Sequence, residues 1–265
     1  RNQQEAPQQY LEFLSSFKHV VDIFMYTPSL PATISEADIP KFKEYLGSFF
    51  NALTNDKEHY IQITVPTEAN ASKEGLDYET YHDALCNALS VDFPELRKSC
   101  REQVEKLKDK SYIEILTGSQ YLLKLDIRNR KWCIDDGCGD YPAGEVSIAP
   151  IEGNSNGDLL VSIVNFRGQI YENVRLTFKD GKLIKSSTKE LEEFFHSVPE
   201  NFRILCEFGI GLNPKVKDII GFTLVDEKAL GTYHIGLGMN HLSGGENNCP
   251  FHMDFVFRCD EVIYR

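Results

Sequence analysis

The sequence predicts an α+β fold, in which a helix-rich amino-terminal region precedes a strand-rich domain. Apolar residues recur at helical spacing through most of the region before Lys110, whereas short runs with strand-like alternation dominate the rest. The chain has 265 residues, of which 42% are hydrophobic and 26% charged, as is typical of a folded globular protein. We place the boundary so that residues 1–115 form the helix-rich region and residues 116–265 form the strand-rich domain.

The amino-terminal region is expected to hold four helices and one strand. Apolar residues at helical spacing predict a first helix over Tyr10–Phe24, which Thr27-Pro28 and Leu30-Pro31 would end, and the polar residues before it are expected to fray. Asp77 and Asp92 are typical N-cap residues for two later helices. The predicted elements are helices over 10–24, 38–53, 77–89 and 92–108 and a strand over 60–65.

The strand-rich domain is expected to contain many short strands and one helix. Asp180-Gly181 between two of the strands is a strong hairpin signal, because this dipeptide tolerates the positive φ angles of a tight turn. A helix over Thr188–Val198 is predicted from its single apolar face. The predicted strands are 112–116, 121–127, 131–134, 159–164, 170–178 and 183–185, with further strands from Arg203 to the end.

Composition excludes several classes of function. Forty acidic and 28 basic residues give a formal charge of −12, which repels phosphate backbones and anionic lipid surfaces, so nucleic acid and membrane are not expected partners. No run approaches the roughly 18 apolar residues of a membrane-spanning helix, and the start has no signal-peptide pattern. Seven cysteines without a C-x-x-C spacing are expected to be free thiols in a reducing compartment, so a cytoplasmic location is expected.

One stretch near the carboxyl terminus combines a buried strand pattern with two polar side chains. Apolar residues recur with a period of two over Phe251–Phe257, which predicts a strand with one buried face. His252 and Asp254 share the other face, roughly 6.5–7 Å apart along the chain, and could reach one metal ion. Such a pair alone is more often simply solvated.

Three further acidic or imidazole side chains stand beside glycines or in apolar runs. Glu145 lies in a turn that feeds a strand, and an unpaired Glu207 in its apolar run would cost several kcal/mol. His234 has Gly236 two residues on, which leaves room beside the imidazole. Each also has an ordinary structural interpretation: Glu145 as a surface turn residue, Glu207 paired with Arg203 or Lys228, and His234 as a hydrogen-bonded core histidine.

Taken together, three carboxylates and two imidazoles favour a metal site. This mixture of oxygen and nitrogen ligands suits one or two ions of the zinc, cobalt or manganese type and suits calcium poorly. Two such ions could lower the pKa of a shared water and polarise a carbonyl, which is hydrolytic chemistry.

The order of the motifs makes the sequence similar to a known family. In order and approximate spacing they resemble the aminopeptidase T family of dinuclear metallo-aminopeptidases, over roughly residues 75–258. The motifs are Pro142-Ala143-Gly144-Glu145, Arg167-Gly168-Gln169 with the Asp180-Gly181 hairpin, Glu207-Phe208-Gly209-Ile210-Gly211-Leu212-Asn213-Pro214, Asp226-Glu227-Lys228, Gly231-Thr232-Tyr233-His234-Ile235-Gly236-Leu237-Gly238, Gly244-Gly245-Glu246-Asn247 and His252-Met253-Asp254.

The resemblance implies that the strand-rich domain is a metallopeptidase catalytic domain that holds two divalent ions, zinc, cobalt or manganese. Its implied ligands are Glu145, Glu207, His234, His252 and Asp254, the same five that the residue patterns indicate. The implied reaction removes the amino-terminal residue of short peptides through a water that the two ions activate. Glu145 or Glu207 would carry a proton to the leaving amine. A homodimer is a further expectation from the resemblance.

Two departures from the family pattern keep alternatives open. The family has a tyrosine seven residues after the first histidine, and here that position is His241, which could carry the proton or add a third imidazole ligand. Family members also carry a longer amino-terminal domain, which leaves substrate enclosure and dimer contacts open. The alternatives are a catalytically impaired metal-binding or structural homologue and a hydrolase of another small amide or ester.

Overall fold

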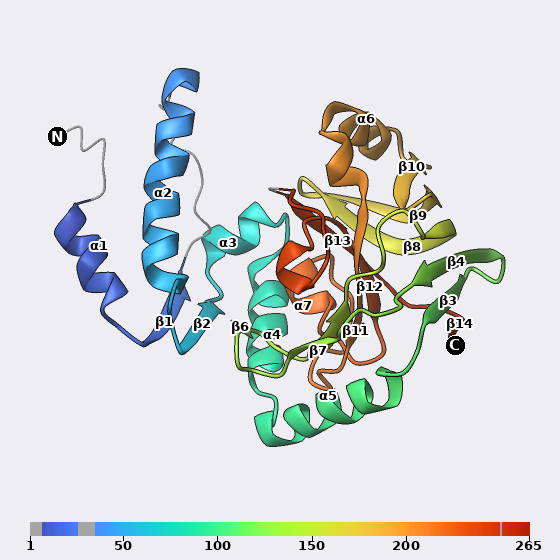
Figure 1. Ribbon diagram of the computed structural model, residues 1–265, viewed down its shortest axis with the longest axis horizontal. Coiled ribbons are helices and arrows are strands. Elements are labelled where there is room, and N and C mark those ends of the chain that lie inside the picture. Colours follow the sequence, from blue (N-terminus) through green and yellow to red (C-terminus); the bar gives the residue numbers. More distant parts are fainter. Residues whose placement is uncertain (1–6, 26–34, 250) are drawn as a thin grey trace.

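The computed structural model describes residues 7–25, 35–249 and 251–265 and confirms the α+β architecture (Figure 1). The described strands form three sheets, of three, six and five strands. The longer helices come first in the chain and the two larger sheets follow, as the sequence predicts. The division into residues 1–115 and 116–265 stays a prediction.

The amino-terminal end contains a parallel strand pair where the sequence predicts one long helix. Helix α1 (Gln8–Ser15) is short. Strand β1 (His19–Phe24) pairs in parallel with β2 (His59–Thr64), and helix α2 (Ile39–Thr54) connects the two strands along the chain. The predicted helix over Tyr10–Phe24 is therefore wrong beyond Ser15. The β-branched residues of β1 favour an extended chain, and pairing with a distant strand decides the outcome. The sequence predicts fraying up to about Gln9, but Gln8 and Gln9 belong to α1; residues 1–6 of that stretch and the expected stop at residues 27–31 lie outside the described residues.

Three further helices lead to the strand-rich part. They are α3 (Glu68–Lys73), α4 (Tyr78–Leu89) and α5 (Phe93–Leu107). The two predicted N-caps are confirmed, because Asp77 accepts the Thr80 N–H at 2.9 Å and Asp92 accepts the Glu95 N–H at 3.1 Å. Among the described helices, none combines the length and the apolarity that crossing a membrane requires.

The larger antiparallel sheet forms one wall of the core. Asp180 and Gly181, with φ of 48° and 72°, join two of its strands and confirm the predicted hairpin. Helix α6 (Lys189–Ser197) buries Leu191 and Phe195 against the core. In sheet order the strands are β10 (Lys182–Ser186), β9 (Gln169–Lys179), β8 (Asn156–Phe166), β4 (Tyr121–Asp126), β3 (Tyr112–Thr117) and β14 (Glu261–Tyr264).

The five-stranded sheet carries the predicted site. One face contributes Phe208, Ile235 and Phe255 to the hydrophobic core that it shares with the larger sheet. All its neighbouring strands are antiparallel. In order they are β13 (His252–Phe257), β12 (Tyr233–Gly238), β11 (Leu205–Gly211), β7 (Glu145–Ile148) and β5 (Cys133–Asp135), while the short β6 (Asp140–Tyr141) pairs with β2 and α7 (Thr223–Asp226) precedes β12.

A buried asparagine ties the helix-rich region to the start of β7. The Asn213 side chain is fully buried and donates to the carbonyl oxygens of Ala88, at the end of α4, and Ala143, two residues before Glu145. The Gly144 carbonyl accepts the Leu212 N–H at 2.8 Å. These bonds fix the turn from which Glu145 enters the sheet.

Candidate metal centre

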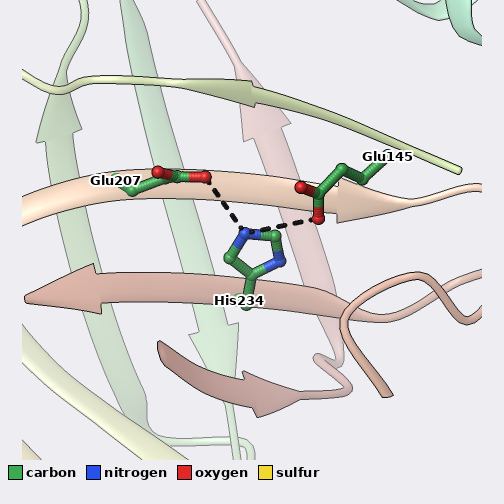
Figure 2. A group of neighbouring side chains, drawn as sticks. All are labelled: Glu145, Glu207 and His234. Atoms are coloured by element: carbon green, nitrogen blue, oxygen red, sulfur yellow. Dashed lines mark hydrogen bonds and ion pairs between the residues drawn. The ribbon is translucent and has the colours of Figure 1, made fainter. Parts of the chain in front are cut away.

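The five predicted ligands lie on adjacent strands of one sheet. Glu145 begins β7, Glu207 is in β11, His234 is in β12, and His252 and Asp254 are in β13. Since side chains alternate along a strand, the register of these strands places all five on the face opposite the apolar core. Figure 2 shows the first three of them turned toward one another.

Glu207 stands between two groups of potential ligands. Its Oε1 lies 3.4 Å from Nε2 of His234, which is also 3.8 Å from Oε2 of Glu145. Its Oε2 lies 3.9 Å from Nε2 of His252, which is 2.9 Å from Oδ1 of Asp254. Within the described residues, Glu145, Glu207 and His234 form a group whose ligand atoms all lie within 4.8 Å of one another.

Glycines opposite the ligands give the site its space. A Cβ atom on Gly209 would lie 2.0 Å from Cε1 of His234, and one on Gly236 would lie 2.8 Å from Oδ1 of Asp254 and 2.9 Å from Cβ of Glu207. Real Cβ atoms essentially never come this close to another heavy atom. The sequence places Gly236 beside His234, whereas across the strands Gly209 makes room for that imidazole.

Each histidine directs Nε2 into the site. His252 Nδ1–H donates to the carbonyl oxygen of Met239 at 3.0 Å, which fixes the ring and leaves Nε2 toward Asp254. His234 is 1% exposed, and its Nε2–H donates to Glu207. In His252 the bonded Nδ1 and the Nε2 that faces carboxylates form the usual arrangement of a metal-binding imidazole, whereas Nδ1 of His234 is buried and has no hydrogen-bond partner among the described residues.

A buried lysine lies behind Glu145. Lys228 is 4% exposed, and its Nζ lies 2.8 Å from Glu145 Oε1, 3.0 Å from Glu227 Oε1 and 3.2 Å from Asp135 Oδ2. Burial alone would lower the pKa of Lys228, but these carboxylates outweigh it and raise that pKa well above the ordinary value. The sequence patterns did not single out Asp135 or Glu227, although Glu227 stands in the motif Asp226-Glu227-Lys228. The structure pairs Lys228 with Glu145, not with Glu207.

The pKa shifts within the cluster indicate that its carboxylates favour nearby positive charge. Burial raises the pKa of Glu145 despite the nearby Lys228, whereas hydrogen bonding to His234 and its charge lower the pKa of Glu207 against the effect of burial. Burial would lower the pKa of both histidines, yet the surrounding carboxylates raise that of His234 to about 9, and the hydrogen bond to Asp254 raises that of His252 to about 12. Protons thus occupy positions where a cation is favoured.

The donor set fits a divalent transition metal. Oε2 of Glu145 is buried and has no hydrogen-bond partner among the described residues, which is costly for a carboxylate unless a cation approaches it. Carboxylate oxygens and imidazole nitrogens together suit zinc, cobalt and manganese. We conclude that the five residues are chemically and geometrically suited to hold metal.

His241 lies apart from this arrangement. It is exposed in the short 3₁₀ turn His241–Ser243, and within the described chain no hydrogen bond or ion pair joins it to the five ligands. The turn is anchored by Glu152, whose Oε1 accepts from Asn240 Nδ2 at 2.6 Å and from the Glu246 N–H at 2.8 Å. A catalytic role of His241 stays a prediction.

The glycine opposite Glu207 and Asp254 offers a test of the site. Replacing Gly236 with alanine is expected to weaken Co²⁺ binding by roughly tenfold or more, because the methyl group would displace three candidate ligands, Asp254, Glu207 and His252. Gly47→Ala on α2 is the matched control, since its Cβ would meet nothing within 4 Å. Equal Co²⁺ affinity of both variants in a titration would contradict this site.

The stability of metal-free protein should fall as pH rises from about 6.5 to 9. His234 has a folded pKa of about 9 against an ordinary 6.5, so its contribution is complete below pH 6.5 and is lost as pH rises through 9. The raised pKa of Glu145 acts in the same direction. His234 alone accounts for about 3 kcal/mol of this loss, and the raised pKa of His252 adds to it. Thermal unfolding with chelator should show the decline and Zn²⁺ should suppress it; rising stability of the metal-free form would contradict it.

Two solved structures have a fold similar to that of this chain. AmpT from Thermus thermophilus matches with a TM-score of 0.72 and 16% sequence identity, over 98% of this chain and 76% of AmpT. A 2,5-dihydroxypyridine dioxygenase from Pseudomonas putida KT2440 matches with a TM-score of 0.60 and 15% identity, over 96% of this chain and 70% of the dioxygenase. At such identities the likeness shows the fold alone, and the fold does not decide the reaction. A comparison with curated proteins finds no match.

The family follows from the sequence match. The family model described as thermophilic metalloprotease (M29) matches residues 4–256, which include all five candidate ligands. This match covers nearly the whole chain and confirms the resemblance on which the expected activity class depends. Membership implies a divalent metal ion. The chain therefore belongs to the thermophilic metalloprotease family M29 and is a metallopeptidase, a hydrolase.

Proposed function

We propose that this protein is an aminopeptidase that removes the amino-terminal residue of short peptides with two divalent ions. The observation that carries the proposal is the position of Glu207, with one carboxylate oxygen toward His234 and the other toward His252. Glu145 would complete the ligands of one ion, and Asp254 those of the second. Zinc, cobalt or manganese would suit both positions.

The charge of the cluster supports two ions. Five carboxylates and one ammonium leave four negative charges when both imidazoles are neutral, and two divalent ions would balance them. The groups are Asp135, Glu145, Glu207, Glu227, Asp254 and Lys228. A single ion would leave two uncompensated charges in a largely buried site, which is unfavourable.

The residues of the chain would orient the peptide and move the proton. When bound, the ions would supply the polarisation of the scissile carbonyl and the activation of the attacking water. The negative charge of the whole chain, −12, favours a substrate with a free ammonium group over one that is blocked. Glu145 or Glu207 would carry the proton to the leaving amine, since both carboxylates lie beside the imidazoles of the proposed centre.

The test combines metal content with hydrolysis of matched substrates. Wild-type protein should bind two Zn²⁺, Co²⁺ or Mn²⁺ ions per chain and cleave an aminoacyl anilide but not its N-acetylated form. His252→Ala should retain one ion, and Glu207→Ala should retain none, because only Glu207 faces both groups; hydrolysis should fall by roughly a hundredfold or more in each.

His196→Ala serves as the control, since His196 is an exposed residue of α6 paired with Glu192. Its metal content and hydrolysis should equal those of wild type. Full activity in Glu207→Ala would refute the assignment. Cleavage of the acetylated substrate would instead indicate a hydrolase of another small amide.

A second candidate is a metal-binding homologue with impaired catalysis. The exposure of His241, at the position where the family has a tyrosine, favours this alternative. If it is correct, His241→Tyr should raise hydrolysis by at least about tenfold while the metal content stays at two, because a phenol would restore a proton donor. Unchanged or lower activity in His241→Tyr, measured on the aminoacyl anilide, would count against it.

A further inference from the structure

Lys228 has its backbone and its ammonium group fixed. Its N–H donates to the Val225 carbonyl oxygen at 3.0 Å, and its own carbonyl oxygen accepts the Asn213 N–H at 2.7 Å. The side chain is 4% exposed, so the ammonium is withdrawn from water. A buried lysine persists only where it is well paired, since removing an unpaired charge from water is very costly.

The three donors of this ammonium match three carboxylates. Nζ lies 2.8 Å from Glu145, 3.0 Å from Glu227 and 3.2 Å from Asp135, and each contact comes from a different segment of the chain. An ammonium is a compact charge with three donors, so it suits a trigonal arrangement of acceptors better than the planar guanidinium of arginine. Lys228 therefore joins β5, β7 and the end of α7.

The contact with Lys228 distinguishes the two carboxylate oxygens of Glu145. Oε1 is held by Lys228, while Oε2 has no hydrogen-bond partner among the described residues and lies 3.8 Å from Nε2 of His234. Rotation of the carboxylate would break the ion pair with Lys228. The lysine thus keeps one oxygen of Glu145 directed toward His234 and Glu207.

We propose that Lys228 is a positioning residue of the metal centre: it restrains Glu145 to bind an ion through Oε2 alone. This inference rests on the proposed function, because it assigns Glu145 as a ligand. Lys228 itself touches neither the ion nor the substrate. Its effect on metal binding passes through Glu145, and the neighbouring Glu227 and Asp135 hold the ammonium in place.

The experiment is a double-mutant cycle read by Co²⁺ binding. Lys228→Met should weaken Co²⁺ binding by roughly tenfold or more and change the intensity of the Co²⁺ visible absorption, since Glu145 is then free to turn. In a Glu145→Gln background the same lysine substitution should change the affinity by less than about twofold, because the group through which Lys228 acts is gone. Equal weakening in both backgrounds would mean a general structural role and would overturn the proposal.

Two further variants keep the test decisive. Lys182→Met removes an exposed lysine paired with Glu200 and should leave affinity and spectrum unchanged. If Lys228→Met does not fold, Lys228→Arg carries the test, because a guanidinium keeps the charge but not the three-way contact, and an altered Co²⁺ spectrum is expected. A wild-type spectrum and affinity in Lys228→Arg would then overturn the inference. Wild-type protein that binds no Co²⁺ would overturn the proposed function as well.

Discussion

The site depends on one electrostatic constraint: several carboxylates share a largely buried face of a sheet and must be neutralised. The hydrophobic core on the opposite face fixes the strands, so the carboxylates cannot separate to relieve their repulsion. Lys228 supplies one positive charge, and protonated imidazoles supply more where no ion is bound. The positive charge that neutralises these carboxylates in the folded sheet would also serve hydrolysis where divalent ions supply it.

The second requirement is space, and the backbone meets it. Glu207 and Asp254 flank Gly236 from the two neighbouring strands, and His234 faces Gly209. Side chains at these two positions would separate the ligands that the sheet brings together. Antiparallel pairing with glycine in alternate positions allows residues from three strands to converge on one face of the sheet.

Sequence patterns could place His252 and Asp254 on one strand face, because that placement depends only on local alternation, and the strand pairing adds Glu145, Glu207 and His234 to the same face. Polar residues at alternate positions of apolar strands had to share a face, whatever the remaining topology. The strand His19–Phe24 could not be predicted in this way, because its partner β2 lies some forty residues later and its own apolar spacing also fits a helix. For the same reason the partners of Lys228 were missed: Asp135 is brought to it only by the pairing of β5 with β7. The exposure of His241 depends on the path of a loop anchored by Glu152.

Asn213 connects the end of α4 to the candidate metal centre, a link that the geometry of the candidate ligands alone does not show. Its side chain bonds both to the last turn of α4 and to the turn that delivers Glu145, so a displacement of that helix is passed through one amide group to the rim of the metal centre. The position of α4 and the position of Glu145 are therefore coupled through this one side chain. Evolution could retune the centre by substitutions along α4 that contact neither metal nor peptide.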